Sequence, residues 1–362
     1  MLAVVVRAAA GDRDDFGRRV HEVLAIDPTY VSMMAELIAP RLDLVSQDAL
    51  AMINAEARLR PTRWRSVLRK SLESERGEVV ARAALMLDRI GDTSDVLRLR
   101  AIARRHRKNT ALASIGRTLA HRLAPRVLVE DLGRVTILVG NRPVPNGAIR
   151  RKVLALLCFL LAQKDLSATR DQALDALWPD LDPGQALNSL NQTLYFLRRV
   201  IEPDYEEDLS PGYVHHEAEV IWLEPSLIDS RSNRCRALIR SLPPTPDPGE
   251  VEALSKMYLE KFARDFEYEE WASQYRDWLH TSYLEIVERA VQSDTNSGHY
   301  GRGIRLAQRA LEVDPDAEQI ELSLLRLYRL AGAHSAAAEQ YEHYARVLRN
   351  TLGVEPPPLE AL

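Results

Sequence analysis

The sequence predicts a mainly α-helical protein with a small β component. Apolar residues recur at helical spacing through residues 1–125 and again after residue 231. Two short segments, 132–144 and 212–223, have the composition of strands and contain turn residues, which predicts hairpins. Gly298 and Gly332 open similar segments at a spacing of about 34 residues, a period typical of stacked helix pairs.

Length and charge limit the classes of protein to consider. A chain of 362 residues can hold two or three domains with proper cores. Cys158 and Cys235 lie far apart without metal-ligand spacing, which indicates a reducing cytoplasm and no disulfide framework. Residues 1–128 carry a net charge of +8, whereas residues 129–230 carry −7. The acidic middle segment argues against non-specific nucleic-acid binding, so any DNA contact must depend on local charge placement.

Residues 1–127 are predicted to form a helical repeat region. The run Gly77–Asp92 is rich in alanine and leucine and ends in a Gly-Asp turn, which indicates paired helices stacked as a solenoid. It resembles a HEAT-type repeat. A basic cluster at 104–108 is interpreted as a solvated helix end, with contact to DNA or an acidic partner as the alternative. Whether the chain is part of a larger protein is left open.

Residues 128–230 show a distinctive order of elements. A hairpin over 132–144 precedes a nearly all-apolar helix, Ile149–Gln163. Thr169 and Gln172 form a predicted capping box that opens a second helix ending at Trp178. A third helix, residues 182–201, is followed by a hairpin at 212–223. Two helices across a short turn, with a hairpin after the second, predict a winged helix-turn-helix.

The helix at 182–201 is the candidate DNA-reading element. Asp182 is its predicted cap, and Pro183 suits the first helical position. An apolar stripe, Leu187, Leu190, Leu194, Leu197 and Ile201, marks one face. The other face is polar, and amide side chains match base edges in the major groove. The predicted base-reading residues are Asn188, Ser189, Asn191, Gln192 and Tyr195. An ordinary surface helix is the alternative interpretation of the same pattern.

A second group of side chains is predicted to contact DNA phosphates. Arg150, Arg151 and Lys152 stand at a helix start, where the helix dipole disfavours cations. A nearby phosphate and plain solvation are equally good explanations for their position. The remaining predicted phosphate contacts are Arg170, Arg198, Arg199, Tyr213 and His215.

Residues 231–362 are predicted to form tetratricopeptide-like helical repeats. The proline-rich stretch 243–248 reads as a stiff linker after a helix at 230–242. The motif Ala310-Leu-Glu-Val-Asp-Pro315 ends one repeat unit, and Gly332 begins the next. Repeats of this kind present a concave surface for protein contacts.

Several motifs together resemble one family. They are Arg150-Arg-Lys152, Ala176-Leu-Trp-Pro179, Ala186-Leu-Asn-Ser-Leu190, Leu197-Arg-Arg199, Pro211-Gly-Tyr213, Glu269-Glu-Trp271 and Leu352-Gly-Val-Glu-Pro356. In this order they resemble the SARP-like bacterial transcriptional activators, in which an OmpR-like winged helix precedes a bacterial transcriptional activator domain (BTAD). The resemblance covers residues 129–362 and implies a regulator, usually an activator, that binds repeated promoter sites and contacts RNA polymerase. The acidic winged-helix segment and the N-terminal helical region depart from that pattern.

The expected partners are therefore double-stranded promoter DNA, RNA polymerase and a second copy of the chain on DNA, in the cytoplasm and without a membrane. A protein-interaction adaptor without specific DNA binding is the alternative function. An enzyme is not expected, because the chain has no phosphate-binding loop, H-E-x-x-H or G-x-S-x-G motif. His215 and His216 are neighbours on a strand and face opposite ways, so no metal site or cofactor is expected there.

Overall fold

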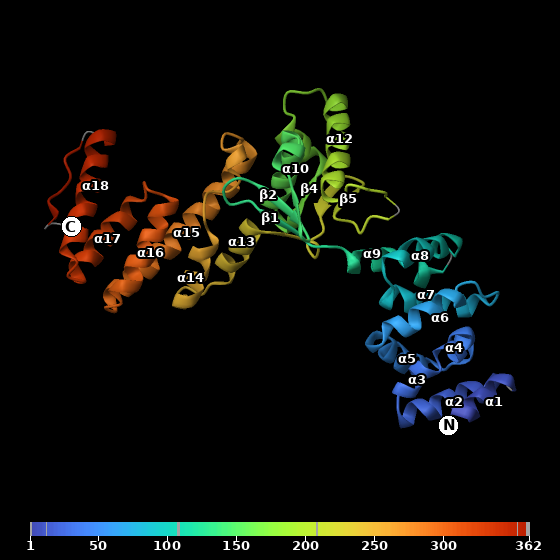
Figure 1. Cartoon of the computed structure of the whole chain (residues 1–362). Coiled ribbons are helices and arrows are strands. Elements are labelled where there is room, and N and C mark those ends of the chain that lie inside the picture. The colour runs from blue at the N-terminus through green and yellow to red at the C-terminus, as the bar shows by residue number, and fades with distance from the viewer. Residues whose placement is uncertain (1, 12, 107–108, 208, 353, 360–362) are drawn as a thin grey trace. The chain divides into compact units, whose positions relative to one another are not determined.

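The computed structural model describes residues 2–11, 13–106, 109–207, 209–352 and 354–359. The protein is mainly helical and contains two small β-sheets, as the sequence predicts (Figure 1). It divides into two compact units. The first comprises residues 1–124 together with 204–212, and the second comprises residues 125–203 together with 213–362. None of the helices in the described ranges is long and apolar enough to cross a bilayer.

The first unit is built from short helices that pack against their neighbours along the chain. The helix predicted over 77–92 is α7, and its sequel α8 is opened by a capping box between Asp92 and Asp95. The helices are α1 (Leu2–Ala10), α2 (Arg13–Ile26), α3 (Thr29–Met33), α4 (Ala35–Ile38), α5 (Gln47–Leu59), α6 (Pro61–Ser71), α7 (Gly77–Ile90), α8 (Thr93–Arg105) and α9 (Arg117–Leu123).

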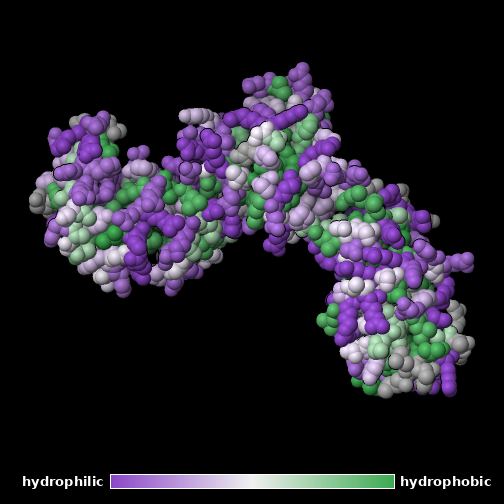
Figure 2. Space-filling view, in the orientation of Figure 1, coloured by the Kyte–Doolittle hydropathy of each residue, from purple (hydrophilic) through white to green (hydrophobic). Residues whose placement is uncertain are grey.

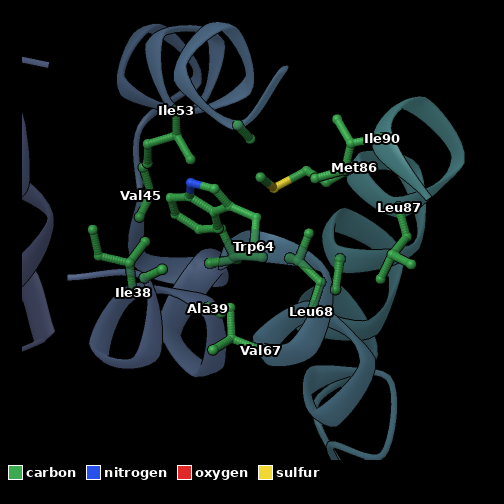
Figure 3. Packing of buried hydrophobic residues seen from close by; sticks show 14 of the residues in the cluster. Ile38, Ala39, Val45, Ile53, Trp64, Val67, Leu68, Met86, Leu87 and Ile90 are labelled. Carbon is green, nitrogen blue, oxygen red and sulfur yellow. The ribbon is translucent and has the colours of Figure 1, made fainter. Parts of the chain in front are cut away.

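The core of the first unit centres on Trp64, which is fully buried. Its indole is surrounded by aliphatic side chains, including Ile38, Ile53 and Leu68 (Figure 3). The indole Nε1 donates to the Ser32 hydroxyl at 3.1 Å, so the one polar atom of this ring is satisfied. A ring of this size buried with a satisfied N–H joins segments from α3 to α7 into one core.

The second unit begins with a four-stranded sheet of order β3-β2-β1-β7. The expected hairpin is formed by β2 (Thr136–Val139) and β3 (Arg142–Val144). The sequence predicts that this strand begins at Leu132, which is wrong, because β2 begins at Thr136. The preceding strand is β1 (Val127–Glu130), which pairs in parallel with β7 (Ile228–Ser230). A parallel partner about a hundred residues away leaves no local signal in the sequence.

Three helices and a second sheet follow the first hairpin. The apolar helix is α10 (Arg151–Ala162), and α11 (Arg170–Leu177) begins at the expected capping box. The polar-faced helix is α12 (Pro183–Ile201). The expected second hairpin is formed by β5 (Val214–Glu217) and β6 (Val220–Leu223). A short strand that was not predicted, β4 (Ser167–Thr169), pairs with β6 and ties the start of α11 to this hairpin.

The remainder of the second unit is helical. Consecutive helices from α15 onward pack against one another (Figure 1). The helices are α13 (Arg231–Ser241), α14 (Pro248–Met257), α15 (Glu270–Asn296), α16 (Tyr300–Val313), α17 (Glu318–Leu330) and α18 (His334–Leu352). The bridge between Leu132 and Phe262 joins the loop before α15 to the strand region.

Asp131 lies at this junction and is completely buried. Its carboxylate accepts from the Ser232 backbone N–H at 2.8 Å and from the Ser232 hydroxyl at 2.6 Å. Its own carbonyl accepts from the Ala263 N–H at 2.8 Å. Burial raises the pKa of this carboxyl to about 6 despite these hydrogen bonds. Asp131 therefore connects the end of β1 to the start of α13 through its side chain and to the loop before α15 through its main-chain carbonyl.

Candidate nucleic-acid interface

Helix α12 forms as the sequence predicts. The Asp182 side chain accepts from the backbone N–H groups of Gly184 and Gln185 at 3.1 and 3.2 Å, and Pro183 occupies the first turn. The reciprocal bond of a capping box is not formed at this end, unlike at Thr169, whose N–H donates to the Gln172 side chain at 2.8 Å. The helix ends at Ile201, two residues before Pro203.

The apolar stripe of α12 is buried in its central and C-terminal parts. Leu190, Leu194, Leu197 and Ile201 are at most 2% exposed. Leu187, the first member of the expected stripe, is only partly buried, and Ala186 takes its place in the core. Helix α10 packs against α12, so the buried face of α12 rests on an almost entirely apolar helix. This packing fixes which face of α12 remains at the surface.

The polar stripe of α12 consists of Asn188, Asn191, Gln192, Tyr195 and Arg199. All five side chains are exposed, and their steps of three and four residues place them along one side of the helix. Hydrophilic residues cover the outer side of α12 in the space-filling view (Figure 2). Ser189 lies off this stripe and is only partly exposed, with its carbonyl accepting from the Thr193 hydroxyl at 2.7 Å.

Tyr195 and Arg199 are connected to each other. The Arg199 Nη1 donates to the Tyr195 hydroxyl at 3.0 Å, and the guanidinium carbon lies 5.9 Å from the centre of the tyrosine ring. The other terminal nitrogen of Arg199 donates to the Pro203 carbonyl at 2.9 Å. These contacts hold the guanidinium along the helix surface rather than extended into solvent.

Arg150 adds a cation beside this stripe. Its guanidinium carbon lies 4.0 Å from the centre of the Phe196 ring, and Phe196 in turn meets the Tyr195 ring edge to face at 5.5 Å. Stacking on an aromatic face orients a guanidinium while leaving its N–H groups available. Arg150 is therefore placed next to α12 by Phe196, a residue whose role sequence reasoning missed.

The other cations at the start of α10 have protein partners. Arg151 donates to the Asp265 carbonyl at 3.1 Å and to the Glu269 carboxylate at 3.0 Å. Lys152 donates to the Leu177 carbonyl at 2.6 Å. The sequence predicts either a phosphate contact or plain solvation for this cluster, whereas in the structure Arg151 and Lys152 contact the loop before α15 and α11. No local pattern marks Glu269 as the partner of Arg151.

Two further predicted phosphate contacts also face protein groups. Arg170, the first residue of α11, forms an ion pair at 2.7 Å with Glu219 in the turn of the β5–β6 hairpin. The Arg198 Nε donates to the Val214 carbonyl at 3.2 Å. Both side chains are only partly exposed. They connect α11 and α12 to the hairpin and so fix its position relative to the helices.

The hairpin residues Tyr213 and His215 differ in their surroundings. Tyr213 is 2% exposed, its hydroxyl donates to the Pro125 carbonyl at 2.5 Å, and burial raises its pKa to about 12. The phosphate contact expected of Tyr213 stays a prediction, and in this structure its hydroxyl is used within the protein. His215 is partly exposed and stacks on Trp222 with the ring centres 4.7 Å apart.

Comparison with known proteins links the C-terminal helices to transcription regulators. Residues 249–361 match the bacterial transcriptional activator domain family. The regulatory protein AfsR of Streptomyces griseus is 24% identical over 239 residues, 63% of this chain and 23% of that protein. AfsR of Streptomyces coelicolor is 26% identical over 209 residues, 56% of this chain and 20% of that protein. The chain thus spans less than a quarter of the length of these relatives.

A solved structure is also similar in part. Mycobacterium tuberculosis EmbR, determined in complex with a low-affinity phosphopeptide, is 17% identical, with 66% of this chain and 64% of that chain covered at a TM-score of 0.45. The match to the domain family and the two AfsR alignments agree with the resemblance read from the sequence motifs. The chain is accordingly similar, at low identity, to part of the AfsR regulatory proteins, and its residues 249–361 match the bacterial transcriptional activator domain.

Proposed function

We propose that this protein is a sequence-specific DNA-binding transcriptional regulator in which α12 reads the major groove. Residues 128–230 would form the winged helix-turn-helix, with the β5–β6 hairpin as its wing. Similarity to the AfsR regulatory proteins supports a regulator over an enzyme. The buried thiols of Cys158 and Cys235 have raised pKa values because of burial, which also speaks against a nucleophilic role.

The polar stripe of α12 is the observation that carries this proposal. Three amides, Asn188, Asn191 and Gln192, are exposed on a helix whose opposite face is firmly packed. Recognition helices meet base edges mainly through their N-terminal half, where these amides lie. An amide can pair with the donor and acceptor of adenine together, whereas Arg199 and Arg150 suit the phosphates or a guanine.

The C-terminal helices are proposed to act as a protein-contact surface. Within this proposal, residues 231–362 form the tetratricopeptide-like activator domain, and RNA polymerase and a second copy of the chain on repeated sites are its partners in the cytoplasm. Residues 1–127 form HEAT-like repeats. Stacked helix pairs of this kind leave an extended surface free for such contacts.

An adaptor that binds only proteins is the second candidate function. The net charge of −7 over residues 129–230 favours it, because phosphate neutralisation normally supplies much of the DNA affinity. The protein's affinity for DNA at increasing salt separates the two candidates. For a DNA binder, the logarithm of the association constant falls linearly with the logarithm of the salt concentration. An adaptor shows no measurable binding to DNA.

The variant Asn191→Ala tests the assignment of α12. After the preferred site has been selected from promoter fragments, this variant is expected to lose about 1–3 kcal/mol of binding free energy on that site and little on random DNA. Arg199→Ala is expected to weaken binding to both DNAs, because a phosphate contact carries no sequence information.

Gln319→Ala provides a matched control, since it removes an exposed amide from a helix outside the proposed interface. Binding curves for all variants on both DNAs, at one fixed salt concentration, give the comparison. Equal affinities of the Asn191 and Gln319 variants on the preferred site would show that the amides of α12 are ordinary helix surface.

A further inference from the structure

The loop between α12 and β5 belongs to the first unit, although both of its neighbours in the chain belong to the second. We call residues 204–212 the acidic strap, because they contain four acidic residues and no basic one. The strap has a turn of its own, in which the Leu209 and Ser210 N–H groups donate to the Glu206 carbonyl at 2.9 and 2.8 Å.

Two side chains hold the acidic strap in the first unit. Leu209 packs against the hydrophobic core of the N-terminal helices. Arg100, in α8, is only 6% exposed and donates to the Glu207 carbonyl at 3.2 Å. Glu207 is exposed, so removing the Arg100 side chain costs the strap this hydrogen bond from a charged group, with water free to replace it at the carbonyl.

The turn before α9 packs closely against Arg100. Gly116 has φ +79°, and a Cβ at that position would lie 2.8 Å from the Arg100 Cγ and 2.9 Å from its backbone nitrogen. The Gly116 N–H donates to the buried Asp88 carboxylate at 2.7 Å, which keeps the turn before α9 in place. Only glycine combines this conformation with this close approach. Arg100, which holds the strap, is thus packed tightly against the turn before α9.

Charge reinforces these contacts. Residues 96–124 contain eight basic residues and no acidic one, whereas the acidic strap carries four carboxylates. The strap follows directly on the C-terminal end of α12, where its carboxylates would repel the phosphates of a DNA bound to that helix. Anchoring the strap in a unit with this excess of basic residues favours its carboxylates electrostatically.

The ends of the strap are fixed within the second unit. On one side, the Pro203 carbonyl accepts from Arg199 of α12 at 2.9 Å. On the other, the buried Tyr213 donates to the Pro125 carbonyl at 2.5 Å. The middle of the strap is thus held within the first unit, while the residues that flank it make their own contacts within the second unit.

We propose that the N-terminal unit is an anchor for the acidic strap and that this anchoring increases the DNA affinity of α12. This rests on the proposed function of α12 in reading DNA. The anchor has two effects: it restricts the chain between the reading helix and the wing, and it compensates carboxylates that would otherwise face DNA phosphates. The DNA affinity of the protein then depends on the state of a unit that does not itself read DNA.

The variant Arg100→Ala in the full chain tests the anchor. Hydrogen exchange of the strap amides is expected to become about tenfold faster or more, because the strap loses its hydrogen bond from the Arg100 guanidinium. Arg98→Ala is the matched control, since Arg98 is an exposed residue of the same helix. Leu209→Ser is a second variant that frees the strap and leaves the helices of residues 1–124 unchanged. Unaltered exchange in α7 shows that the unit remains folded.

The same variants are then compared for DNA binding. Affinity is expected to fall about threefold to tenfold at low salt and less at high salt, because ions screen the repulsion between strap and phosphates. Adding Glu206→Gln and Glu207→Gln to Arg100→Ala is expected to restore part of the affinity.

Three outcomes would overturn the proposal at different points. Equal hydrogen exchange of the strap in the Arg100 and Arg98 variants would show that Arg100 does not hold the strap. Faster exchange with unchanged DNA affinity would show that the strap does not affect DNA binding by α12. A wild-type protein that protects its strap but binds no DNA at any salt would retain the anchor and refute the proposed function.

Discussion

Replacing Trp64 by alanine is expected to lower the free energy of unfolding of the first unit by about 3–5 kcal/mol, the usual cost of removing a buried tryptophan side chain. Trp64 is fully buried among Ile38, Ile53 and Leu68, and the cavity left behind would be lined by side chains from several helices (Figure 3). The Ser32 hydroxyl would also lose its indole donor.

Urea unfolding followed by far-UV circular dichroism measures this loss, and hydrogen exchange over α5 to α7 assigns it to the first unit. Leu59→Ala is the control, because Leu59 is 77% exposed and its truncation leaves no cavity. A Trp64 variant no less stable than the Leu59 variant would mean that the core of this unit is not organised around the indole.

The stability of the second unit is expected to fall by up to about 3 kcal/mol as the pH rises from about 4 to above 6, owing to Asp131. The pKa of this carboxyl is raised from 3.8 to about 6 because it is completely buried. A raised folded-state pKa favours the protonated acid in the folded protein. Its stabilising effect is therefore complete below pH 3.8 and is lost as the pH passes through about 6.

The variant Asp131→Asn isolates this effect, since asparagine stays neutral at every pH. The difference in unfolding free energy between wild type and variant is expected to change across pH 4 to 7 by roughly the 3 kcal/mol given above. Asp277→Asn serves as the control, because it alters an exposed carboxylate of α15. A pH-independent difference for Asp131 would show that this carboxyl titrates normally.

The local parts of the candidate interface could be predicted from the sequence. Asp182 and Thr169 cap the N-termini of their helices as expected. The exposed stripe from Asn188 to Arg199 follows from the leucines on the other face of α12. These features depend on residues within one or two helical turns, where capping geometry and apolar periodicity act directly. The division into three domains and the DNA-contact residues remain predictions.

The partners of the cations could not be predicted in this way. Arg151 pairs with Glu269 more than a hundred positions later in the chain, and Arg170 pairs with Glu219 across the hairpin. Tyr213 is a predicted phosphate contact in the sequence, and the structure buries it with its hydroxyl donating to the Pro125 carbonyl. Charge and residue type show that a group needs a partner, but not which distant group supplies it.

By itself, the sequence determined the mainly helical class, the order of elements around α12 and the resemblance to transcriptional activators. Each of these depends on short-range periodicity, helix caps or short motifs, which can be recognised within a few residues. Tertiary structure alone decided the parallel pairing of β1 with β7, the burial of Asp131 and the placement of the acidic strap in the first unit. These features join segments that are far apart in the chain. They form through packing and hydrogen bonds between these distant segments, and the pattern of neighbouring residues does not show which segments will meet.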